Sequence, residues 1–229
     1  MFRLAAFTGL FAGLAMTLTG PSAALAQEPT FYTVSYIEVG PLLAKVGSSA
    51  LLTYRNIGRK EPGAVHVEVY QRIDRPNQFT VLGAWTDQKA FEAHLAGENT
   101  KKLNEKLATL LASPIDTRQH IALTSAPHKS GKDPIVVVTH VDVIPPQKDN
   151  GVEAVKKLAE DSRKHAGNLS FEVWQQTNRP NHFTVIEAWA NRGAFDLHEM
   201  QKDTREFRTK LSAMSGALYD ERLYKSARP

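Results

Sequence analysis

The alternation of hydrophobic and polar residues is clearest in the second half of the chain. Residues 169–174 alternate with a period of two, which predicts a strand with one buried face. The β-branched run at residues 135–143 predicts another strand, which stops at two prolines. Between these strands, Val152, Val155 and Leu158 recur at helical spacing. The pattern therefore predicts a strand, a helix and a second strand, with Gly167 ending the helix.

The pattern continues with a hairpin and a second helix. The segment TNRPN predicts a turn, and residues 183–189 form the expected partner strand. Asn191 is placed to cap one helix that carries Phe195, His198, Phe207, Leu211 and Met214. Residues 216–224 can return as an edge strand. The order β-α-β-β-α-β is that of the ferredoxin-like split βαβ motif.

The first half of the chain repeats this pattern. Glu68 and Glu172, Trp85 and Trp189, and His94 and His198 are each 104 positions apart, and no gap interrupts the register. The halves are thus tandem copies, and two copies are too few for a solenoid. We expect the following elements in the first copy: strands near 31–39, 64–72, 77–85 and 115–121, and helices near 42–60 and 87–111.

Both faces of each predicted sheet carry large apolar residues, although two helices can cover only one face. Val67 and Val69 face one side, whereas Tyr70 and Leu82 face the other. An uncovered apolar face would aggregate, so the second copy is its expected partner. We predict an α+β fold in which two ferredoxin-like units pack sheet against sheet as an intramolecular, pseudo-dimeric α/β barrel. The predicted boundaries are 27–121 for the first unit, 122–134 for the linker and 135–229 for the second unit.

Residues 1–26 have the features of a cleaved signal peptide. Arg3 precedes an apolar run, and Ala24-Leu25-Ala26 fits a small-x-small cleavage site. A membrane anchor is the alternative, but the run is short and is interrupted by Gly20-Pro21. We expect a periplasmic or secreted protein with no membrane contact after cleavage. The chain has no cysteine, and its net charge of +4 is scattered rather than striped, so no nucleic-acid partner is expected.

The segments VVVTHVDVIP and LSFEVWQ…RPNHFTVIEAWAN…AFDLH resemble the antibiotic biosynthesis monooxygenase family. The resemblance covers essentially the whole mature chain as two tandem copies. It implies a dimeric α/β barrel and, as in quinol and anthrone monooxygenases, oxygenation of a small aromatic compound. No cofactor is implied, and O₂ is the co-substrate. Haem-degrading members carry an iron-ligating histidine where this chain has Asn104 and Arg208, which argues against haem degradation.

Cofactor-independent oxygenation needs a buried aromatic substrate, a base and hydrogen-bond donors for the substrate anion. Metal-binding and nucleophile motifs are absent, and His140-Val141-Asp142 lacks a third ligand, so no metal site is predicted. A histidine suits the role of base because its pKa lies near neutrality. The predicted catalytic residues are His140, as the base, and His198. The predicted substrate-binding residues are Trp174, Asn181, Glu187, Trp189 and Phe195.

The second copy is predicted to carry the active site because of its polar substitutions. His140, His182 and Glu187 replace Tyr36, Gln78 and Gly83, and Trp174 replaces Tyr70. The alternative is drift of a surface without function. A core role is the favoured alternative for His198, because His94 occupies the same place after a phenylalanine.

Two further functions stay open for the whole protein. The same cavity could shelter a hydrophobic small molecule without catalysis, or the fold could bind nothing. Convergent polar groups around a cavity would favour an enzyme, whereas a dry apolar cavity would favour a carrier.

Overall fold

The computed structural model describes residues 31–125 and 127–229, so the expected signal peptide lies outside the described residues. Each copy has the predicted β-α-β-β-α-β order. The elements of the first copy are β1 (Phe31–Glu38), η1 (Pro41–Leu43), α1 (Ala44–Gly58), β2 (Ala64–Arg72), β3 (Gln78–Trp85), α2 (Gln88–Ala96), α3 (Glu98–Ala108) and β4 (Asp116–Thr124). Those of the second copy are β5 (Ile135–Asp142), η2 (Pro145–Gln147), α4 (Lys148–Ser162), β6 (Asn168–Gln176), β7 (His182–Trp189), α5 (Arg192–Glu199), α6 (Lys202–Ser212) and β8 (Asp220–Ser226).

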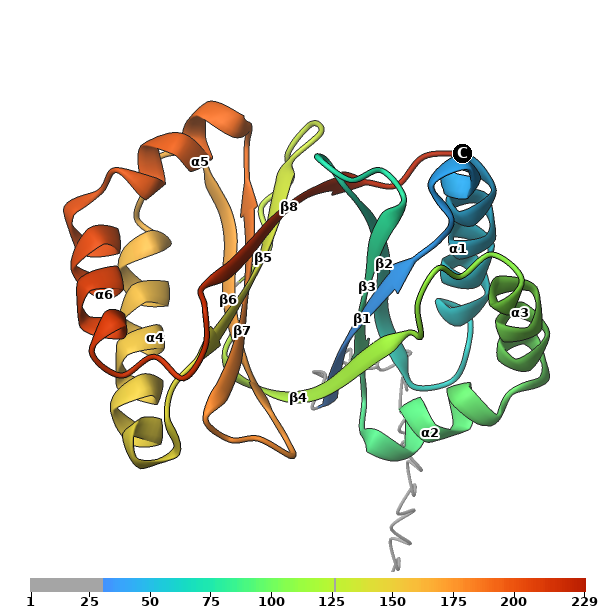
Figure 1. Cartoon of the computed structure of the whole chain (residues 1–229), viewed down its shortest axis with the longest axis horizontal. Coiled ribbons are helices and arrows are strands. Elements are labelled where there is room, and N and C mark those ends of the chain that lie inside the picture. Colours follow the sequence, from blue (N-terminus) through green and yellow to red (C-terminus); the bar gives the residue numbers. More distant parts are fainter. Residues whose placement is uncertain (1–30, 126) are drawn as a thin grey trace, which may run out of the picture.

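The eight strands form one closed barrel in the order β1-β3-β2-β8-β5-β7-β6-β4. Strand β4 pairs with β1 of its own copy and with β6 of the other, and β8 pairs with β5 and β2 in the same manner. Figure 1 shows β4 and β8 crossing between the two halves at opposite sides of the barrel. This closure gives each described strand a neighbour on both sides, although the β2–β8 ladder joins only residues 70–72 to residues 224–226. The prediction of a pseudo-dimeric α/β barrel is confirmed.

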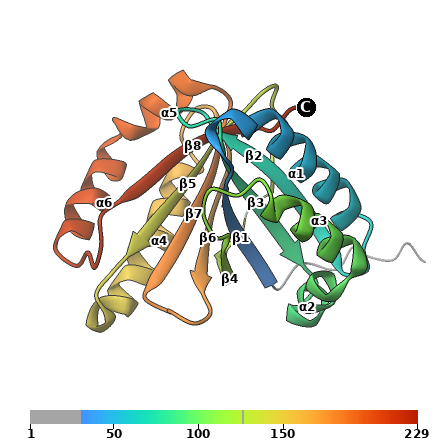
Figure 2. The same cartoon turned by 45° about the vertical axis from the view of Figure 1, so that its right-hand side comes forward.

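Helices cover only the outer face of each sheet. Figure 2 shows α1, α2 and α3 outside the first sheet and α4, α5 and α6 outside the second. Each helical layer and its sheet enclose an apolar core, centred on Val69 and Phe79 in the first copy and on Val173 and Phe183 in the second. A third apolar cluster, which includes Val34 and Val138, lies inside the barrel. The alternation of the strands therefore fills both faces, as the sequence pattern predicts.

The helix predicted near residues 87–111 is two helices. Asp87 caps α2 through a 2.8 Å hydrogen bond from the backbone N–H of Ala90, and α2 ends at Ala96, before Gly97. The backbone of Gly97 is extended, so the chain changes direction before α3 begins at Glu98. The helix predicted after Asn191 is likewise two helices, because the backbone of Gln201 is extended between α5 and α6. The break therefore does not depend on glycine, and the hydrophobic spacing alone does not show it in either copy. Strand β4 is also longer than expected and continues to Thr124, into the predicted linker.

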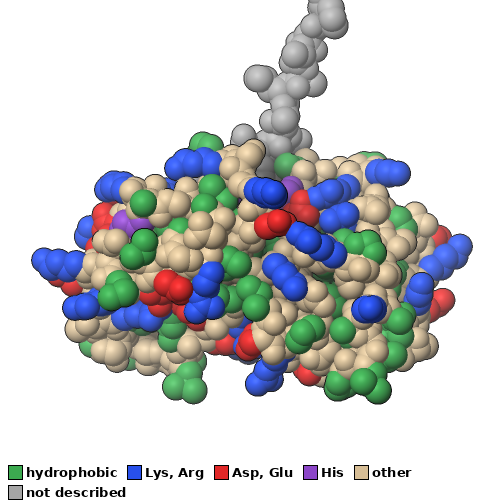
Figure 3. Space-filling view, turned by 90° about the horizontal axis from the view of Figure 1, so that it is seen from above, with side chains coloured by type: hydrophobic (Ala, Val, Ile, Leu, Met, Phe, Trp, Pro, Cys, Tyr) green, Lys and Arg blue, Asp and Glu red, His purple; other side chains and the backbone are tan. Residues whose placement is uncertain are grey.

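Charged side chains of both signs intermix on the surface. On the face shown in Figure 3, lysine and arginine side chains are spread among acidic and hydrophobic ones. Among the described residues, no helix has the length and apolarity needed to cross a membrane.

Candidate functional site

An apolar cleft lies between the helices and the sheet of the first copy. Its volume is about 380 Å³. Strands β1, β3 and β4 form its floor, and α1, α2 and α3 form its walls. Apolar side chains dominate the lining, and a few polar groups project among them from Tyr54, Thr100 and Asn104. An apolar cavity with a small number of polar groups is the usual form of a site for a small organic ligand.

Tyr54 connects this cleft to a buried chain of hydrogen bonds. Its hydroxyl lies 2.5 Å from Nε2 of His94, and Nδ1 of the same imidazole contacts a carboxylate oxygen of Glu61. The side chain of His94 is only 1% exposed and packs on the ring of Trp85, with 4.7 Å between ring centroids. Glu61 can accept only from Nδ1–H, which leaves Nε2 to accept from the Tyr54 hydroxyl.

This arrangement follows the logic of a nucleophile–histidine–carboxylate triad. The carboxylate fixes the tautomer of the imidazole, and the imidazole is ready to take a proton from the hydroxyl. Burial, and then the charge of Glu61, raise the pKa of Tyr54, so the phenol is protonated when the cleft is empty. A proton that reaches the Tyr54 oxygen from a ligand can pass on to His94. The chain can therefore relay a proton out of an apolar cleft.

Local sequence places the three residues. Tyr54 lies in α1, and Glu61 follows in the loop that ends with Gly63 at a φ of 81°. This positive φ favours glycine, and a Cβ here would lie 2.4 Å from Cβ of Ala90 in α2. His94 lies in the last turn of α2. The close approach of the loop to α2 brings Glu61 to His94.

In the second copy, charged and aromatic side chains fill the equivalent space. Arg208 replaces Asn104, and its guanidinium lies 2.5 Å from Glu199 and 2.9 Å from Glu221. The same guanidinium lies 4.8 Å from the ring centroid of Tyr219. These three partners stand where the first copy has Leu95, Thr117 and Ile115. Burial, and then the charge of Glu199, raise the pKa of Glu221 to about 7.

The relay is also changed in the second copy. Leu158 replaces Tyr54, and His165 replaces Glu61. His198 keeps the place of His94 and stacks on Trp189 at 4.5 Å, but its Nδ1 now contacts Nδ1 of His165 at 2.9 Å. Burial, followed by the charge of His165, lowers the pKa of His198 to about 4. His198 thus contacts the hydroxyl of Thr204 at 3.3 Å, but it has no tyrosine hydroxyl in the place of Leu158.

Four of the predicted site residues cluster on the helix side of the second sheet. Glu187, Trp189, Phe195 and His198 are all buried there. Glu187 accepts a 2.8 Å hydrogen bond from Nε1 of Trp189, and its carboxylate lies 3.7 Å from Nε2 of His198. Burial is the main cause that raises the pKa of Glu187 to about 8. These residues therefore form a packed core cluster, and their predicted roles in binding and catalysis remain predictions.

His140 and Trp174 lie on the opposite face, inside the barrel. Nε2 of His140 is 2.5 Å from the hydroxyl of Tyr36, its counterpart in the first copy. Burial, followed by the charge of Arg118, lowers the pKa of His140 to about 3. His140 and His198 are thus separated by the sheet and do not form one site. Asn181 lies in the β6–β7 turn and donates a 2.6 Å hydrogen bond to the carbonyl of Val143.

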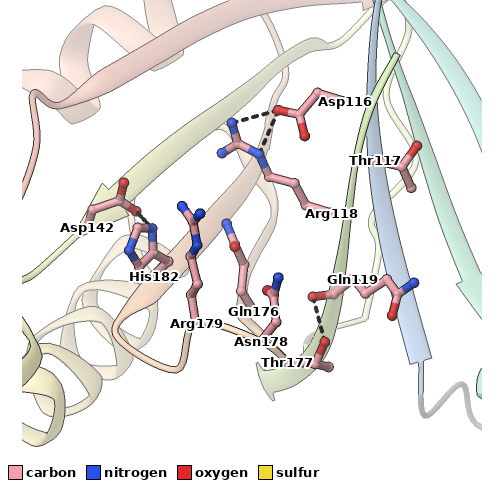
Figure 4. A pocket seen from close by; sticks show the side chains of 10 residues that line it. All are labelled: Asp116, Thr117, Arg118, Gln119, Asp142, Gln176, Thr177, Asn178, Arg179 and His182. Atoms are coloured by element: carbon pink, nitrogen blue, oxygen red, sulfur yellow. Dashed lines mark hydrogen bonds and ion pairs between the residues drawn. The ribbon is translucent and has the colours of Figure 1, made fainter. Parts of the chain in front are cut away.

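A polar pocket of about 430 Å³ opens beside β4 and the β6–β7 turn (Figure 4). Arg118 pairs with Asp116 at 2.8 Å, and His182 pairs with Asp142 at 2.9 Å. Arg179 points into the same space. The internal ion pairs neutralise much of the charge, and the lining offers little apolar surface to an aromatic compound. The pocket therefore suits the expected substrate class less well than the cleft does.

Comparison with known proteins identifies the family. The model of the antibiotic biosynthesis monooxygenase family matches residues 48–106 and 134–210, one segment in each copy. The chain belongs to this family. A candidate monooxygenase from Fusobacterium nucleatum is 16% identical, with a TM-score of 0.77 over 88% of this chain and 94% of that one. An anthrone oxidase-like protein is 13% identical, with a TM-score of 0.71 over 89% and 93% of the two chains. These likenesses establish the shared tandem fold.

A relative found by sequence gives no information on activity. An uncharacterised protein from Synechocystis is 29% identical over 99 residues, which is 43% of this chain and 67% of the relative. In the present chain, the residues that the structure describes include no group of three or more histidine, cysteine or acidic side chains that could hold a metal ion.

Sequence reasoning missed Tyr54 and Glu61. Both lie far from His94 in the sequence, at separations of 40 and 33 positions. The duplication carries the relevant signal, because the second copy has Leu158 and His165 at these places. These two substitutions change side-chain chemistry as much as those at His140 and Glu187 do. They favour the first copy as the one with a functional site.

Proposed function

We propose that the first copy oxygenates a small phenolic or quinol-type aromatic compound in its helix–sheet cleft, with O₂ as co-substrate and no metal or flavin. The observation that carries this proposal is the position of Tyr54. It lines the apolar cleft and is hydrogen-bonded to the buried His94–Glu61 pair. Membership of a monooxygenase family supports the reaction type.

The relay supplies the step that starts the reaction. The substrate hydroxyl gives its proton to the Tyr54 oxygen while the Tyr54 proton moves to Nε2 of His94, and Glu61 stabilises the imidazolium that forms. The apolar walls hold the aromatic ring and keep water from the anion. Asn104 and Thr100 line the same cleft and offer hydrogen bonds to the anion.

The electrons then come from the substrate alone. The anion passes one electron to O₂, and the resulting radical and superoxide join to form a peroxide. For an anthrone-type CH₂ group, loss of the remaining C–H proton breaks the O–O bond. The ketone keeps one oxygen atom, and the other leaves as water. The balance is one CH₂ group and one O₂ in, and one carbonyl and one water out, so no external reductant is needed.

A carrier of hydrophobic compounds is the second candidate. The mostly apolar lining of the cleft favours it, because a carrier needs the cavity but not the relay. Haem degradation is less favoured, since Asn104 lines the cleft at the place of the expected iron-ligating histidine. We also propose export with cleavage after residue 26. Intact mass spectrometry of protein from the periplasm or medium should then show Gln27 as the first residue.

The test is oxygen consumption by the purified, metal-free protein across a panel of phenols, anthrones and quinols. We expect a compound that consumes O₂ with stoichiometric formation of the oxygenated product. Tyr54→Phe should lower the rate while leaving ligand affinity within a few fold, because the ring still lines the cleft. Binding without any O₂ consumption would favour the carrier, and an unchanged rate in Tyr54→Phe would reject the relay.

A further inference from the structure

A second cavity lies inside the barrel, on the other face of the sheet from the cleft. Its volume is about 290 Å³. Leu82, Ala84, Val136 and Ile186 give it an apolar floor, and Ser125 and His128 of the inter-copy linker line it as well. The volume is at the lower end of the range for ligand sites, which suits a molecule with a single ring. The proposed relay does not use this space, because Tyr54 and His94 do not line it.

The cavity contains a buried carboxylate. Glu172 projects inward from β6 and is only 5% exposed. One of its oxygens accepts a 2.9 Å hydrogen bond from Nε1 of Trp174, and the other lies 2.6 Å from Nε2 of His128. A buried carboxylate is costly unless a cationic partner and hydrogen bonds compensate it. A cation that donates a hydrogen bond to the second oxygen would therefore stabilise this carboxylate.

His128 fills that requirement from outside. It belongs to a stretch without helix or strand, and its side chain is 65% exposed. The hydrogen bond to Glu172 raises the pKa of His128, as expected beside a carboxylate that is stabilised by a cation. Because an exposed loop side chain holds the position, a ligand can displace it without unfolding the barrel.

Aromatic rings surround the carboxylate. The ring centroids of Tyr32 and Trp174 are 4.6 Å apart, and Tyr70 lines the same cavity. The faces of such rings attract cations, and the attraction grows when water is excluded. A carboxylate at the end of an aromatic wall thus selects an organic cation over a neutral or anionic molecule of the same shape.

We propose that this cavity binds a small arylalkyl ammonium ion, whose ammonium group replaces His128 at Glu172 and whose ring lies against Tyr32 and Trp174. The duplication supplies a built-in control. The matched carboxylate, Glu68, is 21% exposed at its side chain, pairs with Arg59 and is not part of this cavity lining. Glu68 also lies 3.6 Å from His66, which lines the cavity, so Glu68→Gln removes the same charge beside the site and leaves the buried carboxylate in place.

The experiment is calorimetric titration of the full chain with phenethylamine, and with phenethyl alcohol and hydrocinnamate as its neutral and anionic counterparts. We expect the amine to bind roughly tenfold or more tightly than either counterpart. Glu172→Gln should weaken amine binding by a similar factor, since its amide oxygen can still accept from Trp174 and preserve the fold. Glu68→Gln should leave the affinity within about twofold.

His128→Ala gives the second arm. Removing the internal competitor should tighten amine binding, whereas a supporting role of His128 would weaken it. Equal binding of amine and alcohol, no binding of any probe, or an unchanged affinity in a folded Glu172→Gln variant would each overturn the proposal. Oxygen consumption should not change in Glu172→Gln, so failure here is distinguishable from failure of the cleft proposal.

Discussion

The two copies share one backbone plan but treat the space between helices and sheet in opposite ways. The first copy keeps an apolar cleft with Tyr54 on its wall, whereas the second packs Arg208 and its acidic partners into the same place. One chain can keep two such copies because each half completes the barrel of the other through β4 and β8. One copy is thus free to serve stability while the other keeps a cavity.

The largest effect should come from the two matched histidines. His94→Gln should lower turnover by about 10²–10⁴-fold, because the glutamine cannot carry the relayed proton. His198→Gln should leave turnover nearly unchanged, since His198 contacts His165 and has no tyrosine hydroxyl in place of Leu158. Steady-state O₂ consumption on the substrate found in the panel measures both, and circular dichroism checks that both fold. Equal losses would mean that both copies work and that the cleft is not the distinguishing feature.

A second comparison concerns how each copy satisfies its buried tryptophan. Trp85 Nε1 donates to Thr33 Oγ1 at 3.2 Å, whereas Trp189 Nε1 donates to Glu187. Thr33 pairs across the strands with Gly83, and Val137 pairs with Glu187 at the same register. A Cβ on Gly83 would lie 2.5 Å from Thr33 Oγ1 and 2.7 Å from Trp85 Nε1. Each copy therefore has one acceptor for its tryptophan and no room for a second.

Gly83→Glu should accordingly destabilise the protein by about 2–4 kcal/mol, because it crowds the indole and buries a second acceptor. Adding Thr33→Val, which copies the second half, should recover part of that loss. Urea denaturation of the two single variants and the double variant gives the coupling free energy. Additive changes in the free energy of unfolding would show that these two positions do not substitute for each other as the source of the tryptophan's hydrogen-bond acceptor.

Introducing into the first copy the charged side chains that occupy this space in the second should close the cleft. Asn104→Arg with Thr117→Glu places the charged pair of Arg208 and Glu221 across the opening. We expect ligand affinity to fall at least about tenfold, or about 1.4 kcal/mol, because the pair occupies apolar space that the ligand needs. Titration with the panel substrate measures this fall. The matched control is Arg208→Asn with Glu221→Thr, which should leave affinity for that substrate unchanged.

Much of the fold can be predicted from the sequence because burial imposes a simple period on each strand. Alternation at residues 169–174 marks β6, and the apolar inner face, including Val138, demands the barrel. The break at Gly97 is missed because hydrophobic spacing continues across it. The relay is missed for a different reason: Tyr54, Glu61 and His94 come from two helices and a loop, and no local pattern records their contact.

Sequence differences between copies also do not show which side of the sheet they affect. His140 and Glu187 both look like gains of function, yet His140 points into the barrel and Glu187 points toward the helices. Glu187 has a structural explanation in the hydrogen bond to Trp189. A duplicated chain therefore reveals candidate sites most reliably when both copies are compared at every position that faces one cavity, here Tyr54 with Leu158 and Asn104 with Arg208.

The most gradual effect should be a pH dependence of stability that arises in the second copy. Burial raises the pKa of Glu187 from 4.5 to about 8, so the folded protein holds a proton there that the unfolded chain releases above its own pKa. The free energy of unfolding then falls as pH rises from about 5 to 8, with a slope of up to about 1.4 kcal/mol per pH unit from this group.

Glu187→Gln keeps an acceptor for Trp189 and removes the titration. The stability of the variant relative to the wild type should therefore rise with pH over this range and level off above pH 8. Urea denaturation at a series of pH values measures the difference. Parallel stability curves from pH 5 to 8 would show that Glu187 is already ionised in the folded protein, and that the second copy's core tolerates a buried negative charge beside Arg208.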